Sequence, residues 1–305
     1  MPMPTTDLLR ELEPVAAREV DRHLATSKEW MPHDYVPWDE AEDFVNKPWS
    51  VEQSRMSPIA RMALEVNLLT EDNLPSYHRE IDVAFGREGA WGTWTGRWTA
   101  EEGRHAIVMR DYLTVTRAVD PVQLERDRML NMQHGYHSND KTVPQVLAYV
   151  SFQELATRIS HRNTGLYSND PVCDKLLARV AADENLHHVF YRNMTAAALA
   201  LDPSQMVPAI RDEIVGFAMP GTGIRGFQRK SVMIALAGIY DQRIHHDEVI
   251  WPLLRGWNFF DLEGLDDEAE KARTEVAEFL TDLNRSADAF TATRAEREAK
   301  LAARG

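Results

Sequence analysis

Glutamate and histidine recur along this chain in an order that restricts the folds open to it. The order is Glu, Glu-x-x-His, Glu, Glu-x-x-His, and its members are Glu71, Glu102, His105, Glu154, Glu184 and His187. Residues three apart lie on one face of an α-helix, so each Glu-x-x-His pair can chelate one metal ion. The single glutamates precede the pairs by 31 and 30 residues, which is about one long helix and its return. Two antiparallel hairpins could therefore aim all six side chains into a four-helix bundle.

Such a set of ligands favours two metal ions over one. Four carboxylates and two ferrous ions are formally neutral together, which removes most of the free-energy cost of burying the charges. Carboxylate oxygens and two imidazoles suit iron or manganese, whereas a tetrahedral zinc site is usually richer in His or Cys. The only cysteine, Cys173, allows neither an intramolecular disulfide nor an iron–sulfur cluster. We therefore expect two iron ions that activate O2, with manganese as a substitute metal.

Apolar residues follow helical spacing through most of the chain, and no window alternates as a strand would. The expected helices span about 7–24, 57–70, 75–85, 93–119, 121–132, 144–163, 171–200, 203–217, 228–254 and 266–302. Four prolines, Pro121, Pro144, Pro171 and Pro203, stand at the starts of these segments, where proline is tolerated in the first helical turn. The prediction is an all-α helix bundle with a four-helix di-metal core and additional flanking helices.

The two ends of the chain differ from the central helices. Residues 1–50 should form an N-terminal helix and then an extended segment that covers the bundle, because Pro32, Pro37 and Pro48 interrupt helical structure. From about residue 290 to 305 the sequence is weakly apolar, which predicts a tail that frays or packs on a partner. No low-complexity linker separates two folding units, so we expect a single domain over residues 1–305.

Charge and hydropathy exclude several classes of partner. The net charge of −14 argues against binding to nucleic acid, and no basic run is interleaved with aromatic residues. No stretch approaches 18 consecutive apolar residues, so a membrane span is not expected. The first residues lack the apolar core of an export signal, which favours a cytoplasmic protein.

Six strings in the sequence carry a resemblance to a known family. Three surround predicted ligands, at 94–105 (WTGRWTAEEGRH), 152–164 (FQELATRISHRNT) and 181–187 (AADENLH). The others lie at 69–75 (LTEDNLP), 30–37 (WMPHDYVP) and 254–265 (LRGWNFFDLEGL). The chain resembles the soluble plant-type acyl-[acyl-carrier-protein] desaturases, which are ferritin-like di-iron carboxylate proteins, and the likeness extends over most of its length.

This resemblance implies a function and a role for each matched residue. The function is O2-dependent formation of a cis double bond in an acyl chain on acyl carrier protein, with electrons from ferredoxin and a homodimeric enzyme. The implied ligands are Glu71, Glu102 and His105 for one iron, Glu154, Glu184 and His187 for the other, with some carboxylates bridging. Thr157 would face the side where O2 binds, and Trp30, Asp183 and His105 would form the electron route from the surface. For Thr157 the alternative is a hydroxyl bonded to its own helix, and for Trp30 and Asp183 it is packing and capping.

The sequence departs from the family pattern at Gly103, Leu186 and His188, which leaves the tuning of the metal centre and the rate of turnover open. Pro75 cannot donate a hydrogen bond to the carbonyl of Glu71, so an irregular turn is expected between them. The remaining candidate histidines form no further Glu-x-x-His pair, and surface or structural roles are expected for them: His161, His188, His245 and His246.

Several alternatives stay open from the sequence. The six residues could be solvated glutamates and structural histidines. The same site could instead serve a di-iron hydroxylase or N-oxygenase that acts on a carrier-bound intermediate. A ferritin-like metal-binding protein without an organic substrate is the alternative outside enzymes. Since acyl carrier protein is acidic, docking would need a local basic patch, for which Arg225, Arg229 and Lys230 are the candidates.

Overall fold

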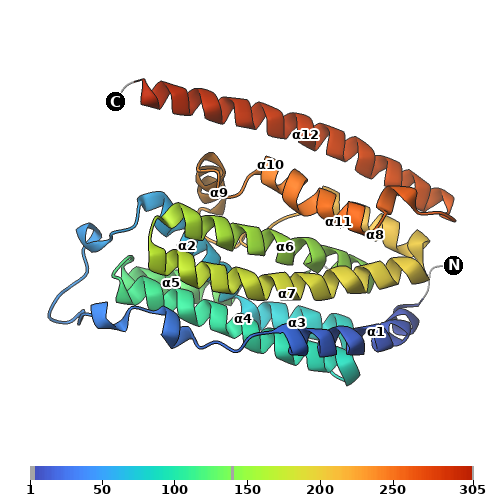
Figure 1. Ribbon diagram of the computed structural model, residues 1–305, viewed down its shortest axis with the longest axis horizontal. Helices are drawn as coiled ribbons and strands as arrows, with labels where there is room; N and C mark the ends of the chain where they lie inside the picture. The colour runs from blue at the N-terminus through green and yellow to red at the C-terminus, as the bar shows by residue number, and fades with distance from the viewer. Residues whose placement is uncertain (1–3, 139–140, 304–305) are drawn as a thin grey trace.

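Every regular element in the part of the chain that the computed structural model describes, residues 4–138 and 141–303, is a helix (Figure 1). The α-helices are α1 (Thr5–Thr26), α2 (Pro58–Glu71), α3 (Leu74–Phe85), α4 (Gly89–Val115), α5 (Pro121–His134), α6 (Val143–Ser168), α7 (Pro171–Leu201), α8 (Pro203–Val215), α9 (Phe227–Leu236), α10 (Gln242–Ile244), α11 (Trp251–Gly256) and α12 (Asp267–Ala302). A π-helical turn, η4 (His245–Ile250), joins α10 to α11. The predicted all-α fold is confirmed.

Side-chain caps and first-turn prolines set the starts of the central helices. The Asp170 carboxylate accepts hydrogen bonds from the backbone N–H groups of Val172 and Cys173 at the start of α7. At the start of α6, Thr142 and Gln145 form a reciprocal capping box. Pro144 and Pro171 occupy the first turns that follow, where the missing N–H group leaves no helical hydrogen bond unmade.

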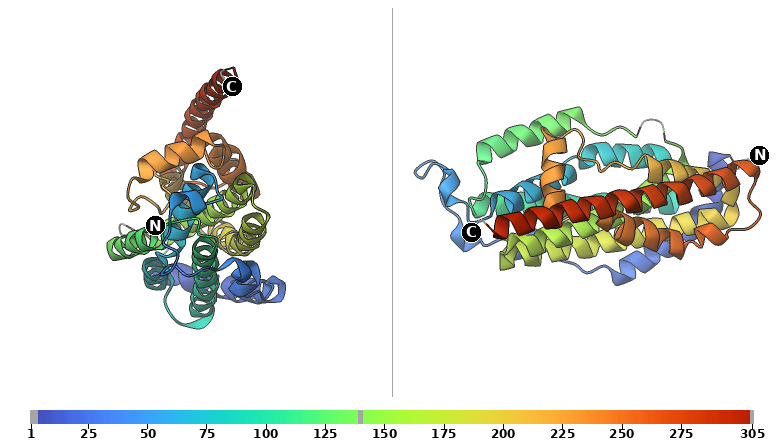
Figure 2. Two further views of the ribbon diagram at one scale, coloured as in Figure 1. Left: turned by 90° about the vertical axis from the view of Figure 1, so that its left-hand side faces the viewer. Right: turned by 90° about the horizontal axis from the view of Figure 1, so that it is seen from above.

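The long helices α4, α6 and α7 run side by side along the bundle, and α1 packs on both α4 and α7 (Figures 1 and 2). The view along the bundle places α12 at the edge remote from α1 (Figure 2). Large aromatic side chains fill the space between α4 and α7, where the rings of Trp94 and Phe190 stack with centroids 3.6 Å apart. Burial of this apolar surface holds the helices that carry the site in register.

The segment after α1 lies on the bundle through short 3₁₀ turns, η1 (Pro32–Tyr35), η2 (Trp38–Glu40) and η3 (Val51–Gln53), of which η1 contacts α4 and α7. Trp30 is buried at its start. Arg117, just beyond α4, anchors the rest, since its guanidinium donates to the Lys47 carbonyl at 2.5 Å and to Gln53 Oε1 at 2.9 Å. The same guanidinium carbon lies 4.2 Å from the ring centroid of Phe44.

Two segments near the C-terminus differ from the sequence-based expectation. The helix expected over 228–254 is divided into α9, α10, η4 and α11. The break falls at Gly238, whose φ of +71° is incompatible with a continuous right-handed helix. The tail expected to fray from about residue 290 is helical to Ala302 and largely exposed. Packing of this tail on a partner and the single domain over 1–305 stay predictions, and residues 1–3 and 304–305 lie outside the described residues.

Candidate metal centre

Four helices supply the six predicted ligands: Glu71 from α2, Glu102 and His105 from α4, Glu154 from α6, and Glu184 and His187 from α7. Glu71 is the last residue of α2, and α3 begins at Leu74. Pro75 has no N–H group for the carbonyl of Glu71, so the chain turns between the two helices. The irregular turn predicted at Pro75 is therefore confirmed, and it directs Glu71 into the bundle.

The six side chains converge as two overlapping groups. One group is Glu71, Glu102, His105 and Glu184, and the other is Glu102, Glu154, Glu184 and His187. Within each group the potential ligand atoms lie within 4.8 Å of one another, and every member is buried. Glu102 and Glu184 belong to both groups, so a metal ion in each group would share these two carboxylates.

Both histidines turn the same ring nitrogen toward the acids. His105 Nδ1 lies 3.1 Å from Glu184 Oε1 and 3.2 Å from Glu102 Oε2. His187 Nδ1 lies 2.8 Å from Glu102 Oε1 and 3.7 Å from Glu154 Oε2. The Nε2 atoms of both rings point outward, where each meets another buried acid. This arrangement leaves Nδ1 as the atom available to a metal on each side.

The donor atoms at the centre fit a pair of hard metal ions. Glu154 Oε2, Glu184 Oε1 and His187 Nδ1 are buried and contact other predicted ligands, but they form no hydrogen bond of regular geometry among the described residues. Buried polar atoms normally form regular hydrogen bonds, so three that do not, around one point, call for a ligand. Carboxylate oxygens and imidazole nitrogens are donors that suit iron or manganese. The residues therefore fit a di-metal centre.

The acids and imidazoles shift one another's protonation strongly. Burial would lower the pKa of His105 and His187, but the surrounding carboxylates, chiefly Glu102 for His105 and Glu101 for His187, raise both pKa values well above 6.5. Burial, reinforced by the negative charge of Glu102, raises the pKa of Glu184 well above its usual range. Protons thus compensate the buried acids when no metal is bound, and metal uptake must release them.

One outward branch joins His105 to the surface segment through Asp183. Trp30 Nε1 donates to Asp183 Oδ2 at 2.7 Å, and the same oxygen lies 3.5 Å from His105 Nε2. Arg104 and Arg179 also contact Asp183. Burial opposes ionisation of Asp183, but its bonds to His105 and Trp30 and its contact with Arg179 lower its pKa to about 2. The three residues predicted to form an electron route are therefore brought together.

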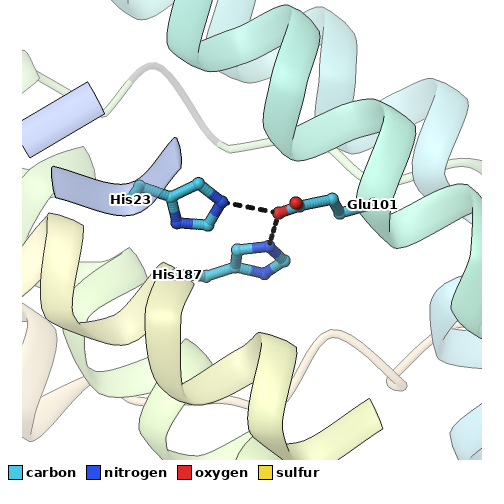
Figure 3. Close-up of side chains that lie close together, drawn as sticks. All are labelled: His23, Glu101 and His187. Atoms are coloured by element: carbon cyan, nitrogen blue, oxygen red, sulfur yellow. Dashed lines mark hydrogen bonds and ion pairs between the residues drawn. The ribbon is translucent and has the colours of Figure 1, made fainter. Parts of the chain in front are cut away.

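A second outward branch, which the sequence reasoning missed, joins His187 to α1 through Glu101 (Figure 3). Glu101 Oε2 lies 2.9 Å from His187 Nε2 and 2.8 Å from His23 Nε2. Burial would raise the pKa of Glu101, but hydrogen bonds from the two imidazoles outweigh it and lower that pKa far below 4.5. Arg97 Nη2 lies 2.6 Å from the other oxygen of Glu101.

The two outer acids occupy equivalent positions and cross between the motifs. Glu101 precedes Glu102 and contacts the histidine of the second motif, whereas Asp183 precedes Glu184 and contacts the histidine of the first. An acid immediately before each Glu-x-x-His pair was therefore a signal in the sequence that could have identified Glu101 together with Asp183. His23 offered no such signal, because it lies 78 residues before Glu101.

Two further side chains contact the predicted ligands directly. His161 Nε2 lies 2.9 Å from Glu71 Oε1, so this histidine is buried beside the centre and does not lie on the surface. Trp98 Nε1 donates to Glu154 Oε1 at 3.1 Å. These contacts restrain the two glutamates that belong to only one group each. His188, His245 and His246 lie outside both groups.

Thr157 is buried one turn after Glu154 and lines a cavity that Glu71 and His161 also line. Its hydroxyl donates to the carbonyl of Gln153 at 2.9 Å and accepts from Gln153 Nε2 at 2.8 Å. The bond to its own helix, the alternative considered for Thr157, is therefore present. A role for Thr157 toward O2 stays a prediction.

A second cavity, which together with the adjoining open solvent has a volume of about 680 Å³, reaches the predicted ligands Glu71, Glu102 and Glu184. Its walls near them are apolar and aromatic: Leu74, Tyr77, Ile81, Trp98, Val146, Tyr149 and Val150. Most of these wall residues are tyrosine, valine or isoleucine, and Leu74 is the leucine among them. Its walls suit an apolar ligand.

The three departures from the family pattern occupy different surroundings. A Cβ atom on Gly103 would meet only Leu74 Cδ2, at 3.9 Å, so the space beside this glycine is open. Leu186 is half-buried. His188 is buried, and its Nδ1 lies 3.1 Å from the carbonyl of Ser151. Burial lowers the pKa of His188 to about 4, so the ring is neutral at pH 7.

Comparison with known proteins agrees with the site. A family model described as fatty acid desaturase matches residues 4–304. The chain is 47% identical over 294 residues to a Mycobacterium tuberculosis protein named as acyl-[acyl-carrier-protein] desaturase DesA1, covering 93% of this chain and 87% of that protein. The chain belongs to the fatty acid desaturase family. Among plant desaturases, the stearoyl-[acyl-carrier-protein] 9-desaturase of Simmondsia chinensis is 30% identical over 294 residues, covering 90% of this chain and 74% of that one.

A solved desaturase structure extends the agreement to the fold. The X-ray structure of DesA2 from Mycobacterium tuberculosis H37Rv superimposes with a TM-score of 0.70 at 29% identity, covering 87% of this chain and 98% of that one. The predicted resemblance to the acyl-[acyl-carrier-protein] desaturases is therefore confirmed, and the chain is an enzyme of this kind. Among the described residues, no helix of this desaturase is long and apolar enough to cross a membrane.

Proposed function

We propose that the chain binds two iron ions between α2, α4, α6 and α7 and desaturates an acyl chain carried on acyl carrier protein. The single observation that supports this most is the apolar cavity that reaches Glu71, Glu102 and Glu184. A buried acid and imidazole cluster alone would suit many metal proteins, whereas an apolar cavity beside it suits a lipid-like substrate. The relatives' names supply the carrier, since they are desaturases of acyl chains on acyl carrier protein.

The bound iron pair would supply the activation of O2 that removes one hydrogen from each of two adjacent methylenes. Two electrons and two protons complete the balance, so that O2 leaves as two molecules of water and the chain gains one cis double bond. The protein's own part is to orient the ligands and the substrate. Asp183 and Glu101 hold the outer nitrogens of His105 and His187, which keeps Nδ1 of each ring directed inward.

The cavity walls select the substrate by position. A methylene offers no polar group, so contact with Tyr77, Trp98 and Tyr149 must place the two reacting carbons beside the metal ligands and exclude water. Each methylene buried contributes about 0.8 kcal/mol to binding. Acyl chains shortened by several carbons should therefore bind much less tightly and react poorly. A flat response of kcat/KM to chain length would contradict this reading of the cavity.

We propose that ferredoxin supplies the electrons through Trp30, Asp183 and His105. The indole of Trp30 stacks on His105 with centroids 6.4 Å apart, and Arg104 and Arg179 hold positive charge beside it. Trp30→Phe removes the N–H donor to Asp183 but keeps an aromatic ring. We expect slower reduction of the loaded enzyme by ferredoxin, with an unchanged rate for a small chemical reductant. Equal slowing with both reductants would contradict the route.

Carrier docking is proposed at the start of α9. Arg225 and Arg229 are exposed there and Lys230 is half-buried. The inner face of α9 lines the cavity beside Thr157 through Phe227, which brings this basic surface close to a path toward Glu71. An acidic carrier should bind it through charge complementarity despite the net charge of −14. Arg229→Glu should raise KM for acyl carriers, and unchanged affinity would exclude this surface.

The test of the function is reconstitution with iron, ferredoxin, its reductase and a panel of acyl carriers, followed by mass analysis. We expect a product lighter by two hydrogens, and Glu102→Ala should abolish its formation. A product heavier by one oxygen atom would instead identify a hydroxylase or N-oxygenase. Metal uptake without any organic product would favour a ferritin-like protein that only binds metal. Sedimentation of the loaded enzyme tests the homodimer, which we propose from the family likeness.

A further inference from the structure

The N-terminal helix α1 contributes one polar side chain to the interior of the bundle next to the metal centre. His23, in the last turn of α1, is fully buried, and its Nε2 lies 2.8 Å from Glu101 Oε2. Its imidazole packs edge-on against Trp94 at 5.1 Å and stacks near His187 at 5.8 Å. Figure 3 shows one oxygen of the Glu101 carboxylate joined to both rings, with α1, α4 and α7 each supplying one side chain.

The directions of the hydrogen bonds follow from the carboxylate. An ionised carboxylate can only accept, so His23 and His187 both donate through Nε2 to the same oxygen of Glu101. His187 Nδ1 faces the acids of the centre, and it would give up its proton when a metal ion binds there. The other ring nitrogen of His23, Nδ1, has no hydrogen-bond partner among the described residues. The polar function of His23 is therefore directed to Glu101.

The Glu101 carboxylate is held from both of its ends. His23 and His187 occupy Oε2, while Arg97 Nη2 lies 2.6 Å from Oε1. Without His23, one donor to Oε2 is lost and the carboxylate can rotate toward Arg97. Such rotation would lengthen its bond to His187 and loosen the orientation of that ring. The ring of His105 would be unaffected, because its outer nitrogen meets Asp183 instead.

We infer that His23 is a positioning residue for the metal ion on the His187 side, and that α1 is thereby a working part of the metal centre. His23 acts through Glu101 and does not touch the ion. This inference rests on the proposed di-metal function, and it adds an asymmetry between the two ions. Only the ion bound by Glu154 and His187 should depend on α1.

The test compares two amide variants of the full-length chain. In His23→Gln the side-chain N–H group can reach the position of Nε2, whereas in His23→Asn it ends near the position of Nδ1. Both proteins are loaded anaerobically with Co²⁺ as the probe, and binding is followed by calorimetry and by the visible absorption of the bound ion. For His23→Asn we expect one of two binding steps to weaken roughly 10- to 100-fold, with the other unchanged. His23→Gln should restore that step to within a few-fold of the wild type.

A double variant asks whether His23 acts through Glu101. Glu101→Gln should weaken the same binding step, because an amide oxygen is a weaker acceptor than a carboxylate, and adding His23→Asn to it should cost less than His23→Asn costs alone, because the contact is already weakened. His78→Asn is the matched control, since His78 bonds Thr99 on α4 but contacts none of the predicted ligands. This control should leave both steps unchanged.

Three results would overturn the inference. His23→Asn and His23→Gln could both bind Co²⁺ as the wild type does, both steps could weaken equally, or the losses from His23→Asn and Glu101→Gln could simply add. Each of these leaves the proposed function intact if the wild type still binds two ions. A wild-type chain that binds fewer than two ions would instead overturn the di-metal proposal, and this inference with it.

Discussion

The two halves of the metal centre share their inner ligands and differ in what surrounds them. Each half combines one glutamate, one Glu-x-x-His pair and an acid just before the pair. Outside His105, the Asp183 carboxylate meets an indole and two arginines near the surface segment. Outside His187, the Glu101 carboxylate meets His23 and Arg97 from α1 and α4. The repeat therefore specifies where the predicted ligands converge, and the outer partners make the two positions chemically unequal.

The largest effect is expected at a residue that the halves share. Glu184 belongs to both groups of ligands, so Glu184→Ala should abolish binding of both ions and all desaturation. Glu154 belongs to one group only, and Glu154→Ala should leave about half of the metal bound. Elemental analysis after anaerobic loading with Fe²⁺ measures both. Two ions retained by Glu184→Ala would show that this carboxylate does not bridge.

A smaller effect, on the pH dependence of the free energy of unfolding, should come from the second half alone. His188 follows His187, whereas the apolar Ala106 follows His105. Burial lowers the pKa of His188 from 6.5 to about 4, so between these pH values the unfolded chain binds more protons than the folded chain. The free energy of unfolding should then fall by up to about 3 kcal/mol as the pH drops from 6.5 to 4.

His188→Asn is the variant that checks this loss. The Asn amide can still donate to the carbonyl of Ser151 but does not titrate. Denaturant unfolding of the metal-free proteins at several pH values should give a wild-type curve that falls more steeply below pH 6.5 than the curve of the variant. Parallel curves would mean that the protonation of His188 does not differ between the folded and the unfolded chain.

The next effect, on metal affinity, is expected from Asp183, the outer acid of the first half. Asp183→Asn weakens the acceptor that orients His105, so the ion on that side should bind roughly 10- to 100-fold more weakly. The ion on the His187 side should be unaffected. Asp174→Asn on the same helix is the control, because Asp174 pairs with Arg162 and belongs to neither group. Calorimetric titration would contradict the division into halves if Asp183→Asn weakened both steps.

The smallest effect, on the free energy of unfolding, is expected at Gly103, where the first motif departs from the family pattern. Gly103 lies within α4 where the second motif has Asn185, and a Cβ atom there would make only one ordinary contact. Gly103→Ala should raise the free energy of unfolding by about 0.5 to 1 kcal/mol, because alanine restricts the unfolded chain. Gly96→Ala, also open on α4, should stabilise equally. A loss of stability at Gly103 alone would point to a contact formed only around bound metal.

The sequence predicted which six inner side chains converge, but of the outer partners only Trp30 and Asp183, for a physical reason. Helical spacing of three residues and hairpin spacing of about thirty are local rules, so Glu71, Glu154 and the two pairs could be read from order alone. The contact of His23 with Glu101 depends on how α1 packs against α4 and α7, which no local rule specifies. His161 was assigned a surface or structural role because it lacks a paired glutamate, yet α6 turns it toward Glu71.

Prediction of the secondary-structure elements was limited in the same way, because it could use only local sequence. The turn at Pro75 was predictable because a missing N–H group acts locally. The division of the segment 228–254 was not, since apolar spacing continues across Gly238 while the backbone there takes a positive φ. Glycine permits that conformation without requiring it, so the break depends on tertiary packing, which includes the contact of α10 with α12.

The outer acids are exchanged between α4 and α7, so each helical hairpin depends on the other for an acid beside its histidine. Glu101 serves the histidine on α7, and Asp183 serves the histidine on α4. Cutting the chain between the two hairpins would therefore deprive each fragment of the acid that fixes its own imidazole. Neither fragment should retain an ion by itself, and loading should recover only when the complementary fragments are mixed and reassociate.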